Sequence, residues 1–301
     1  MPIDPNTQRQ RQYRRAIEDS AWGTQYSLIQ VGQDRLYGDP GQGITPDWRQ
    51  QGNSPRGVRE RPYVHAGADV WQDVRPLFTL EYETEVLSDA PVGYWRLGEP
   101  SGGTAYDSSG NQRNGTNTNS PTLGQGGAII DDADTAYAFD GVGAFVNCQN
   151  PGGVFDFTNA FTLECWVRGD TDVGTFDRFV AKGQASGGVP GTEVYGMPTD
   201  GSFQPYSFIR IGGTEYNSAS GTRPSLRDNL WHHVVTTYDG ETLLLYVDGV
   251  QTSSNTTPTG SCDTSTETLK AGVARDGYFK GRIDEFAVYN TVLTAARIQA
   301  H

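Results

Sequence analysis

Cysteine is scarce in this 301-residue chain, which has three: Cys148, Cys165 and Cys262. An odd number of cysteines does not predict a disulfide framework. There is no CxxC motif and no cluster of cysteine with histidine, so a zinc site is not expected. Cys148 and Cys165 both fall in strand-like runs, where a cysteine serves as a small core residue. A single disulfide between these two stays open.

Long apolar runs are also missing. Hydrophobic residues make up 35% of the chain, and no segment approaches the ~20 apolar residues that cross a membrane. The chain begins with the polar segment MPIDPNTQRQRQ, which lacks the apolar core of a signal peptide. We therefore expect neither a membrane span nor export by an ordinary signal peptide.

Sequence patterns of common catalytic sites are absent as well. There is no E-x-D-x-x-E strand motif to place two or three carboxylates on one face, and no G-x-S-x-G elbow. The glycine-rich segment Gly183–Gly191 opens no helix, so it is not a phosphate loop. Glu164 stands alone beside Trp166, and the adjacent His232 and His233 would point to opposite faces of a strand. The chain is therefore not expected to be an enzyme.

Turn-forming and aromatic residues are plentiful, with 38 Gly, 16 Pro, 15 Tyr, 12 Phe and 6 Trp. This composition favours a turn-rich all-β protein whose core is built more from aromatics than from leucine and isoleucine. The net charge of −13 is uneven: residues 1–85 carry −2 and residues 86–301 carry −11. An acidic domain repels nucleic acid and anionic membranes, so neither is expected as a partner. The four arginines between Arg9 and Arg15 suit an acidic protein surface or solvent better than nucleic acid.

The strongest local signal is a hairpin in the segment WHHVVTTYDGETLLLYVDGV. Strands are predicted over Trp231–Tyr238 and Thr242–Val247, because β-branched and aromatic residues flank the turn pair Asp239-Gly240. Leu243, Leu244 and Leu245 are consecutive, so both faces of the second strand should be covered. The histidines and turns of this hairpin are interpreted as scaffold.

Other short strands separated by turns follow the same pattern. They are predicted at Gly93–Leu97, twice within Thr135–Asn147, and at Phe161–Arg168, Arg178–Lys182, Tyr206–Ile211, Thr268–Val273 and Gly281–Tyr289. A short helix is predicted over Thr294–Ala300. Strands at this spacing without alternating helices indicate a two-sheet antiparallel sandwich or jelly roll.

Residues 1–85 have a different texture. Apolar residues share one face at helical spacing over Asn6–Ser20, which predicts a short helix. The following segment, Ala21–Arg75, is polar with scattered aromatics and no sustained period, so it cannot bury much core by itself. We expect an extended arm that lies along a partner surface with its aromatics as anchors. The alternative is that it packs back on its own sandwich.

The segment LFTLEYETEV, Leu77–Val86, joins this arm to the rest of the chain. Glu81, Glu83 and Glu85 alternate with apolar residues, which predicts a strand with a solvated glutamate row. The boundary is placed near residue 85, giving an N-terminal arm over 1–85 and a jelly-roll domain over 86–301.

Five segments within 86–301 resemble, in order, a LamG-like jelly-roll domain of the concanavalin A-like superfamily. They are YWRLGEPSGGTAYDSSGNQRNGT, YAFDGVGAFV, FTLECWVR, LWHHVVTTYDGETLLLYVDGV and GRIDEFAVYNTVLTAARI. The resemblance covers Val86–His301 and leaves out residues 1–85. It implies a two-sheet antiparallel sandwich used mostly to bind glycans or proteins.

The same resemblance implies a structural calcium ion. The matching positions are Asp107, Asn111 and Asp284, with Asn114 beside them, and calcium takes six to eight oxygen ligands of this kind. Alternatively, Asp107 and Asn111 only shape a turn through hydrogen bonds to the backbone. Asp284 lies on an apolar strand, where pairing with either Arg282 or a metal would explain it.

The YWRLGE…DSSGN form resembles the version found in virion proteins of tailed bacteriophages, particularly minor tail proteins. It implies a virion structural protein, either a minor tail or a capsid decoration protein, assembled in the host cytoplasm. Residues 1–85 would anchor it to capsid or tail proteins while the jelly roll adheres to host-surface glycans. Exchange of arms between subunits would favour a homo-oligomer. The alternative is a carbohydrate-binding module of a bacterial secreted or surface protein.

Overall fold

The computed structural model describes residues 28–31, 35–38, 82–130, 132–170, 178–183, 193–274 and 277–301. Internal contacts divide the chain into two units, Met1–Glu81 and Tyr82–His301. In the first unit, β1 (Leu28–Val31) pairs antiparallel with β2 (Arg35–Gly38). Strands of four residues are too short to show a period, so the sequence did not predict this hairpin. The helix predicted over Asn6–Ser20 lies outside the described residues, as does most of the arm.

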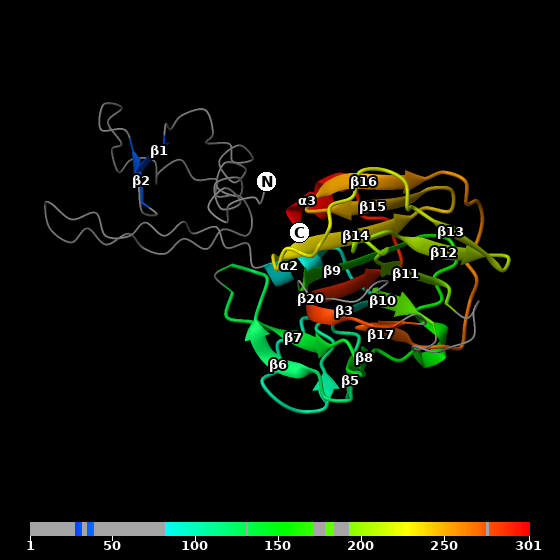
Figure 1. The fold of residues 1–301 in the computed structure, drawn as a ribbon, viewed down its shortest axis with the longest axis horizontal. Coiled ribbons are helices and arrows are strands. Elements are labelled where there is room, and N and C mark those ends of the chain that lie inside the picture. The colour runs from blue at the N-terminus through cyan, green and yellow to red at the C-terminus, as the bar shows by residue number, and fades with distance from the viewer. Residues whose placement is uncertain are drawn as a thin grey trace, which may run out of the picture. The chain divides into compact units, whose positions relative to one another are not determined.

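The second unit is a sandwich of two antiparallel sheets (Figure 1). In spatial order, the front sheet contains β13 (Thr214–Asn217), β12 (Phe208–Ile211), β11 (Tyr195–Pro198), β10 (Arg178–Lys182), β17 (Leu269–Ala271), β8 (Phe145–Asn147), β5 (Gly115–Thr118) and β4 (Thr104–Ala105). The back sheet contains β16 (Val250–Asn255), β15 (Leu243–Val247), β14 (His232–Tyr238), β9 (Phe161–Gly169), β20 (Lys280–Tyr289), β7 (Thr135–Asp140) and β6 (Thr122–Gly126), and β3 (Gly93–Trp95) also pairs with β20.

Smaller elements complete this unit. They are α2 (Tyr82–Ser88), the 3-10 turn η3 (Pro151–Gly153), the ribbon β18 (Val273–Ala274) with β19 (Gly277–Tyr278), and α3 (Ala295–Ala300). The predicted all-β sandwich is confirmed. None of the helices in the described part of the chain is long and apolar enough to cross a membrane.

The core between the sheets is built largely from aromatic side chains, as the composition predicts. The rings of Phe161 and Tyr195 join the two sheets at a centroid distance of 4.9 Å. Trp95 stacks on Phe286 at 5.1 Å, and all four side chains are fully buried. Burying one such side chain stabilises the fold by roughly 1.5–3 kcal/mol. The three cysteines are also buried and free, so no disulfide joins Cys148 to Cys165.

The central hairpin forms as predicted from β14 and β15. Val234 pairs with Val247 and Tyr238 with Leu243. At the turn, Asp239 Oδ1 accepts hydrogen bonds from the backbone N–H groups of Glu241 and Thr242, at 2.9 and 2.7 Å. Leucines of β15 pack into both the main core and a second apolar cluster. Both faces of the strand are therefore covered, as three consecutive leucines indicate.

That second cluster lies on the outer face of the back sheet, beneath α2 and α3. The strand predicted over Leu77–Val86 is wrong from Tyr82 onward, where α2 begins. Tyr82 and Val86 are buried while Thr84 is exposed, which is the i, i+4 pattern of a helix. Residues 82, 84 and 86 alternate with glutamates, which is typical of a strand. Tyr82 and Val86 are also four residues apart, so the same two positions fit one face of a helix.

The predicted solvated row of glutamates is wrong for the same reason. Glu83 Oε2 lies 3.1 Å from Arg96 NH1, and Glu85 Oε2 lies 2.8 Å from Arg297 NH2. These ion pairs connect α2 to the segment after β3 and to α3. The helix therefore belongs to the jelly-roll unit, and the predicted boundary at residue 85 falls inside it.

Candidate functional site

Asp107 and Asn111, two of the predicted calcium ligands, lie in one turn after β4. Asp107 Oδ1 accepts hydrogen bonds from the N–H groups of Tyr94 at 3.0 Å and Ser109 at 2.9 Å. Its Oδ2 accepts one from Arg113 N–H at 2.8 Å. Asn111 Nδ2 donates to the carbonyl oxygens of Pro91 and Val92, both at 3.2 Å. These bonds shape the turn through side-chain-to-backbone contacts.

Asp284, the third predicted ligand, is held elsewhere. Its Oδ2 accepts from Ala128 N–H at 2.7 Å and its Oδ1 from Glu285 N–H at 3.0 Å. These two backbone partners explain why an aspartate lies on an apolar strand. Burial raises the pKa of Asp284 to about 7. Within the described ranges, no group of three or more His, Cys, Asp or Glu side chains is arranged to hold a metal ion. Calcium at Asp107, Asn111 and Asp284 stays a prediction, which the effect of EDTA on Tm would test.

A cluster of carboxylates surrounds Arg96 near Asp284. The guanidinium contacts Asp132 at 2.6 Å, Asp134 at 2.9 Å and Glu285 at 3.2 Å. Burial lowers the pKa of Arg96, but the attraction of Glu285 and its acidic neighbours outweighs that effect and raises it. Arg96 therefore stays charged and neutralises part of the cluster. This arrangement ties β3 to β20 and to the loop before β7.

One row of paired residues crosses all eight strands on the outer face of the front sheet, and each of them except Gly196 carries a side chain. The registers place them on the same face, in the order Thr104, Thr116, Asn147, Lys270, Ala181, Gly196, Phe208 and Asn217. Their neighbours along the strands, such as Val146, Ala271 and Ile209, belong to the main core. Because side chains alternate along a strand, the row points away from the core.

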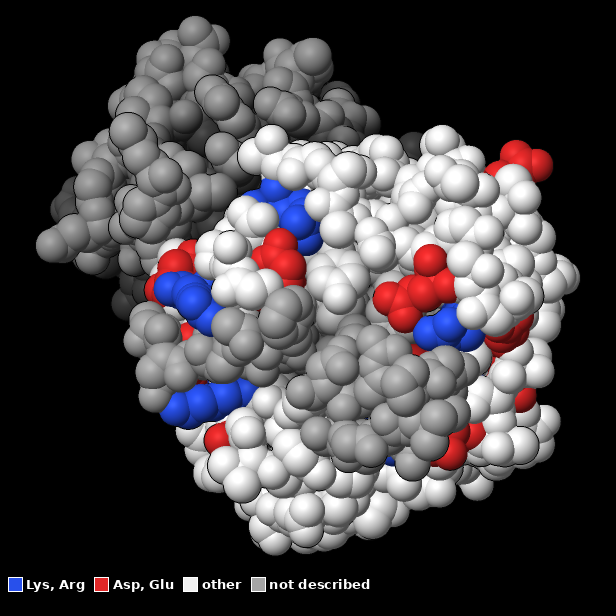
Figure 2. Space-filling view, turned by 45° about the vertical axis from the view of Figure 1, so that its right-hand side comes forward, with Lys and Arg blue, Asp and Glu red and all other residues white. Residues whose placement is uncertain are grey.

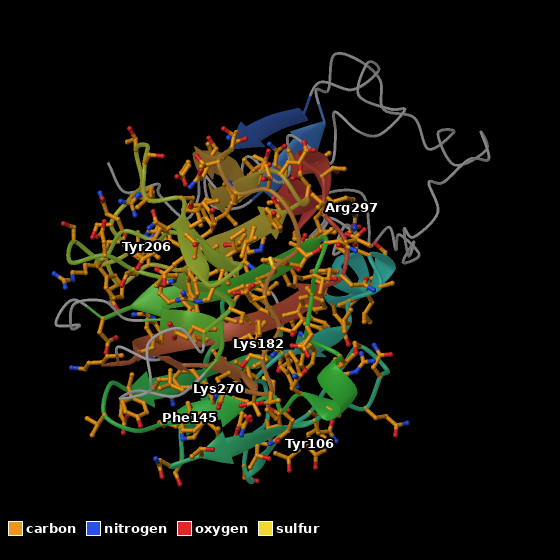
Figure 3. The ribbon with its side chains drawn as sticks, turned by 90° about the vertical axis from the view of Figure 1, so that its right-hand side faces the viewer. Tyr106, Phe145, Lys182, Tyr206, Lys270 and Arg297 are labelled. Carbon is orange, nitrogen blue, oxygen red and sulfur yellow. The ribbon has the colours of Figure 1, made fainter. Side chains whose placement is uncertain are left out.

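Exposure divides this row into a covered middle and an open end. Lys270, Ala181 and Phe208 are buried, whereas the end formed by β8, β5 and β4 is accessible. The accessible residues of this end, which we call the open face, are Thr104, Thr116, Thr118, Phe145 and Asn147. Phe145 and Lys270 lie near each other in Figure 3, while Arg297 lies far from both.

Phe145 gives the open face an aromatic surface. Its ring is partly exposed and leans against Tyr278, with a centroid distance of 6.4 Å and an interplanar angle of 38°. The threonines and Asn147 lie on the same face of β8, β5 and β4. An aromatic plane edged by neutral hydrogen-bonding groups can hold a ligand with one apolar face and a polar rim.

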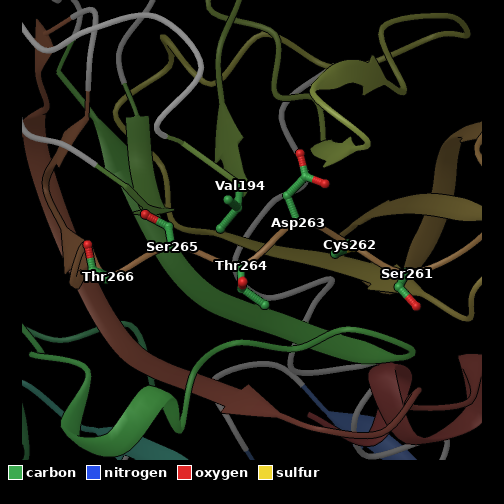
Figure 4. A pocket seen from close by; sticks show the side chains of 7 residues that line it. All are labelled: Val194, Ser261, Cys262, Asp263, Thr264, Ser265 and Thr266. Atoms are coloured by element: carbon green, nitrogen blue, oxygen red, sulfur yellow. The ribbon is translucent and has the colours of Figure 1, made fainter.

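A groove of about 740 Å³ lies at the ends of β10 and β11, next to the loop Ser261–Thr266. Val194 and this loop line it, and Figure 4 shows hydroxyl side chains distributed along it. Asp263 fixes the loop to the β12–β13 turn by accepting from the N–H groups of Gly212 and Gly213, at 2.7 and 2.8 Å. None of the described residues that line this groove is aromatic, so these residues supply hydrogen bonds without a stacking surface.

A buried ionic network, which we call the clasp, lies under the helices of the back sheet. Glu164 Oε2 lies 3.1 Å from His233 Nε2 and 3.0 Å from His301 Nδ1, and Tyr289 OH donates to Glu164 Oε1. His301 Nε2 also lies 3.0 Å from Asp89 Oδ2. Glu164 is fully buried, so it is neither alone, as the sequence indicated, nor accessible to a substrate. The clasp holds α2 and α3 on the sheet.

Stability should depend on pH through His301. Burial lowers its pKa, but the attraction of Glu164 and Asp89 outweighs burial and raises the pKa above 6.5. A raised histidine pKa adds stability that is complete below the unfolded pKa and lost as pH rises through the folded pKa. We expect Tm to fall as pH rises above 6.5, and to fall less in a His301→Gln variant. Equal pH dependence of the two proteins, measured by thermal unfolding, would contradict this.

The sequence did not single out the open face, although its signal was present. In AFVNC, Val146 and Cys148 alternate with Phe145 and Asn147, as expected for a strand with one buried face. What the sequence could not supply was the register that aligns this strand with β5 and β17. Cross-strand pairing, rather than any local motif, assembles the open face.

A family model described as the concanavalin A-like lectin/glucanases superfamily matches residues 140–299, more than half of the chain. No curated protein matches the sequence. Among solved structures, domain 4 of AbnA, an extracellular GH43 arabinanase from Geobacillus stearothermophilus, is similar with a TM-score of 0.51 and 19% identity. The match covers 70% of this chain and 97% of that one.

Two larger proteins contain similar domains. Trypanosoma rangeli sialidase matches with a TM-score of 0.52 and 17% identity, over 73% of this chain and 36% of that one. Botulinum neurotoxin type C matches with a TM-score of 0.52 and 13% identity, over 72% of this chain and 51% of that one. The chain thus spans about half the length of the neurotoxin chain that it matches. At these identities the similarities show the fold.

Proposed function

The chain belongs to the concanavalin A-like lectin/glucanases superfamily, and from that premise we propose that its jelly-roll unit binds glycans on the open face. The observation that carries this proposal is the partly exposed Phe145 ring with threonine hydroxyls and the Asn147 amide on the same face. A sugar ring has an apolar C–H face and a rim of hydroxyls. Phe145 would take the apolar face, and the surrounding polar groups would hydrogen-bond the rim.

The ligands of two proteins with similar folds support the proposal that this chain binds glycans. The arabinanase domain was solved in complex with arabinotriose, and cell entry of botulinum neurotoxin type C depends on interaction with two ganglioside molecules. We propose binding without turnover for this chain, because its open face has no acidic side chain to act as an acid, base or nucleophile. Incubation with a panel of glycans followed by product analysis would detect any hydrolysis.

Replacing Phe145 by alanine should weaken glycan binding about 30-fold, equivalent to about 2 kcal/mol for a central aromatic anchor. Thr116→Ala should weaken it less, because one hydroxyl contact is lost. Thr264→Ala is the matched control, since Thr264 is also exposed but lies in the groove. A glycan array would identify the ligand and calorimetry would give the affinities. Loss of binding in Thr264→Ala with normal binding in Phe145→Ala would move the site to the groove.

We also propose that the protein is a structural protein of a tailed-phage virion, as a minor tail or capsid decoration protein. The phage-like YWRLGE…DSSGN segment and the separate N-terminal unit support this role. Residues 1–85 would join capsid or tail proteins, and the jelly roll would face the host surface. The alternative role is a carbohydrate-binding module of a bacterial secreted or surface protein. In that role the protein would bind glycans but would not be part of a virion.

Deleting the N-terminal unit tests the virion role. Because α2 belongs to the jelly-roll unit, the deletion should end at Glu81 to leave that unit whole. We expect the shortened chain to bind glycans. Its amount in purified particles should be at least about tenfold lower than that of the full chain. Normal incorporation into particles would contradict anchoring through this unit.

A further inference from the structure

The cations of the front sheet limit which glycans the open face can take. Lys270 is the cation of the outer-face row, and it is only 6% exposed. Its ammonium donates to the carbonyl oxygens of Gly183 and Thr268, and Glu267 Oε2 lies 3.8 Å away. Two carbonyl oxygens and one carboxylate therefore already surround the ammonium. Lys270 is therefore committed to the protein's own oxygens.

The other front-sheet cations whose side chains are described are occupied in the same way. Lys182 is fully buried and contacts Asp156 at 2.7 Å and Ser265 O at 2.5 Å. Arg210 donates to Glu193 O at 3.0 Å and Gly213 O at 2.9 Å, and pairs with Glu215. A ligand carboxylate would have to break one of these contacts to gain a charged partner.

The net charge of the jelly-roll domain also disfavours acidic glycans. Residues 86–301 carry a net charge of −11, and like charge repels an anionic ligand within the screening distance. In the view of Figure 2, residues other than Lys, Arg, Asp and Glu make up most of the described surface, and most basic side chains have acidic ones beside them. Among the described side chains of the front sheet, a carboxylate or sulfate brought against Phe145 would find no unpaired cation and would lose hydration.

From these contacts we infer that the ligand of the open face is a neutral oligosaccharide, without sialic acid, uronic acid or sulfate groups. This inference rests on the proposed function and specifies its ligand class. The hydroxyls of the threonines can donate and accept, and Asn147 can donate through Nδ2 while its Oδ1 accepts from Gln149 N–H, which suits sugar hydroxyls. Selectivity against acidic sugars arises here from the absence of an available cation on the described front sheet.

Paired glycans that differ by one acidic group provide the test. The full chain should be titrated with lactose-type and galactan-type oligosaccharides, each with and without a sialic or uronic acid residue. We expect the neutral member of each pair to bind at least about tenfold tighter at 20 mM salt. This preference should shrink at 500 mM salt, where the repulsion is screened.

A charge-introducing variant gives a second measurement. Thr116 is exposed and pairs in register with Asn147, so Thr116→Lys would place an ammonium group at the open face. We expect this variant to bind the acidic glycans relatively better and to reduce the preference. Thr264→Lys, in the groove, is the matched control and should leave the preference unchanged.

The outcomes separate the two proposals. Equal or tighter binding of the acidic member by the unmodified chain at 20 mM salt would overturn the inference and leave glycan binding intact. An unchanged preference in Thr116→Lys would overturn it as well, because charge would then not set the selectivity. Absence of binding to every glycan would overturn the proposed function, and the inference with it.

Discussion

Glu164→Ala should lower the free energy of unfolding by about 3–5 kcal/mol, the range expected when one partner of a buried ionic network is removed. Glu164 is fully buried on β9 and contacts His233, Tyr289 and His301. Burial raises its pKa, but the attraction of His301 and the hydrogen bonds of both histidines bring it down to about 2. The carboxylate is therefore ionised at neutral pH and neutralises positive charge in the clasp.

The size of this effect follows from what alanine leaves behind. Two histidines and a tyrosine hydroxyl would face a cavity, each having lost its acceptor. Glu164→Gln keeps the volume and one hydrogen-bonding oxygen, so we expect a smaller loss. Glu241, which is exposed in the β14–β15 turn, provides the control, because surface substitutions usually change stability by at most about 0.5 kcal/mol.

Urea unfolding followed by tryptophan fluorescence suits this comparison. Trp166 lies on β9 and stacks on His233 at 5.1 Å, so its emission reports on the clasp. A double-mutant cycle with His301→Ala should give a coupling energy of about 1–3 kcal/mol. If Glu164→Ala were no less stable than Glu241→Ala, the clasp would not be a stabilising element of the fold.

The clasp also shows where sequence reasoning ends. Glu164 lies 69 positions from His233 and 137 positions from His301 along the chain. The residues next to Glu164 in the sequence do not indicate its partners. Antiparallel pairing of β9 with β14 brings His233 to Glu164, and docking of the C-terminal helix brings His301. The hairpin Trp231–Val247, in contrast, was predictable, because its strands and its Asp-Gly turn are adjacent in sequence and make their own hydrogen bonds.

Among the candidate binding residues, too, local features could be predicted from the sequence and long-range ones could not. Asp107 and Asn111 could be found because the turn that contains them is local, and the motif order points to it. The open face could not be assembled, because Thr116, Asn147 and Lys270 meet only through the register of three strands. Single positions were visible in the sequence, whereas their common surface depends on long-range pairing.

Lys182→Met should destabilise the protein by about 2–4 kcal/mol, because it removes the charged partner of Asp156 and the ammonium that donates to two carbonyl oxygens. Lys182 Nζ contacts Asp156 Oδ1 at 2.7 Å, Ser265 O at 2.5 Å and Glu267 O at 3.1 Å. Methionine keeps most of the apolar stem, so the effect isolates the ammonium group. We place the expected loss below that of Glu164→Ala because Asp156 retains access to solvent.

The same variant should loosen the loop Ser261–Thr266, since Lys182 ties Ser265 to η3 and β10. Hydrogen exchange of the loop amides should accelerate in Lys182→Met, while amides of β14 and β15 stay protected. The double variant with Asp156→Asn should be no less stable than Lys182→Met alone, because the unpaired carboxylate is gone. A Lys182→Met protein as stable as the unmodified chain would show that the ammonium does not hold the loop.

Glycan binding by this variant links its stability to the proposed site. Phe145, Thr116 and Asn147 lie on β8 and β5, and no contact of Lys182 reaches them. Below the melting temperature, Lys182→Met should therefore bind glycans within about twofold of the unmodified chain, as for residues without shared partners. Loss of binding in the folded variant would instead place the ligand in the groove that the loop Ser261–Thr266 forms.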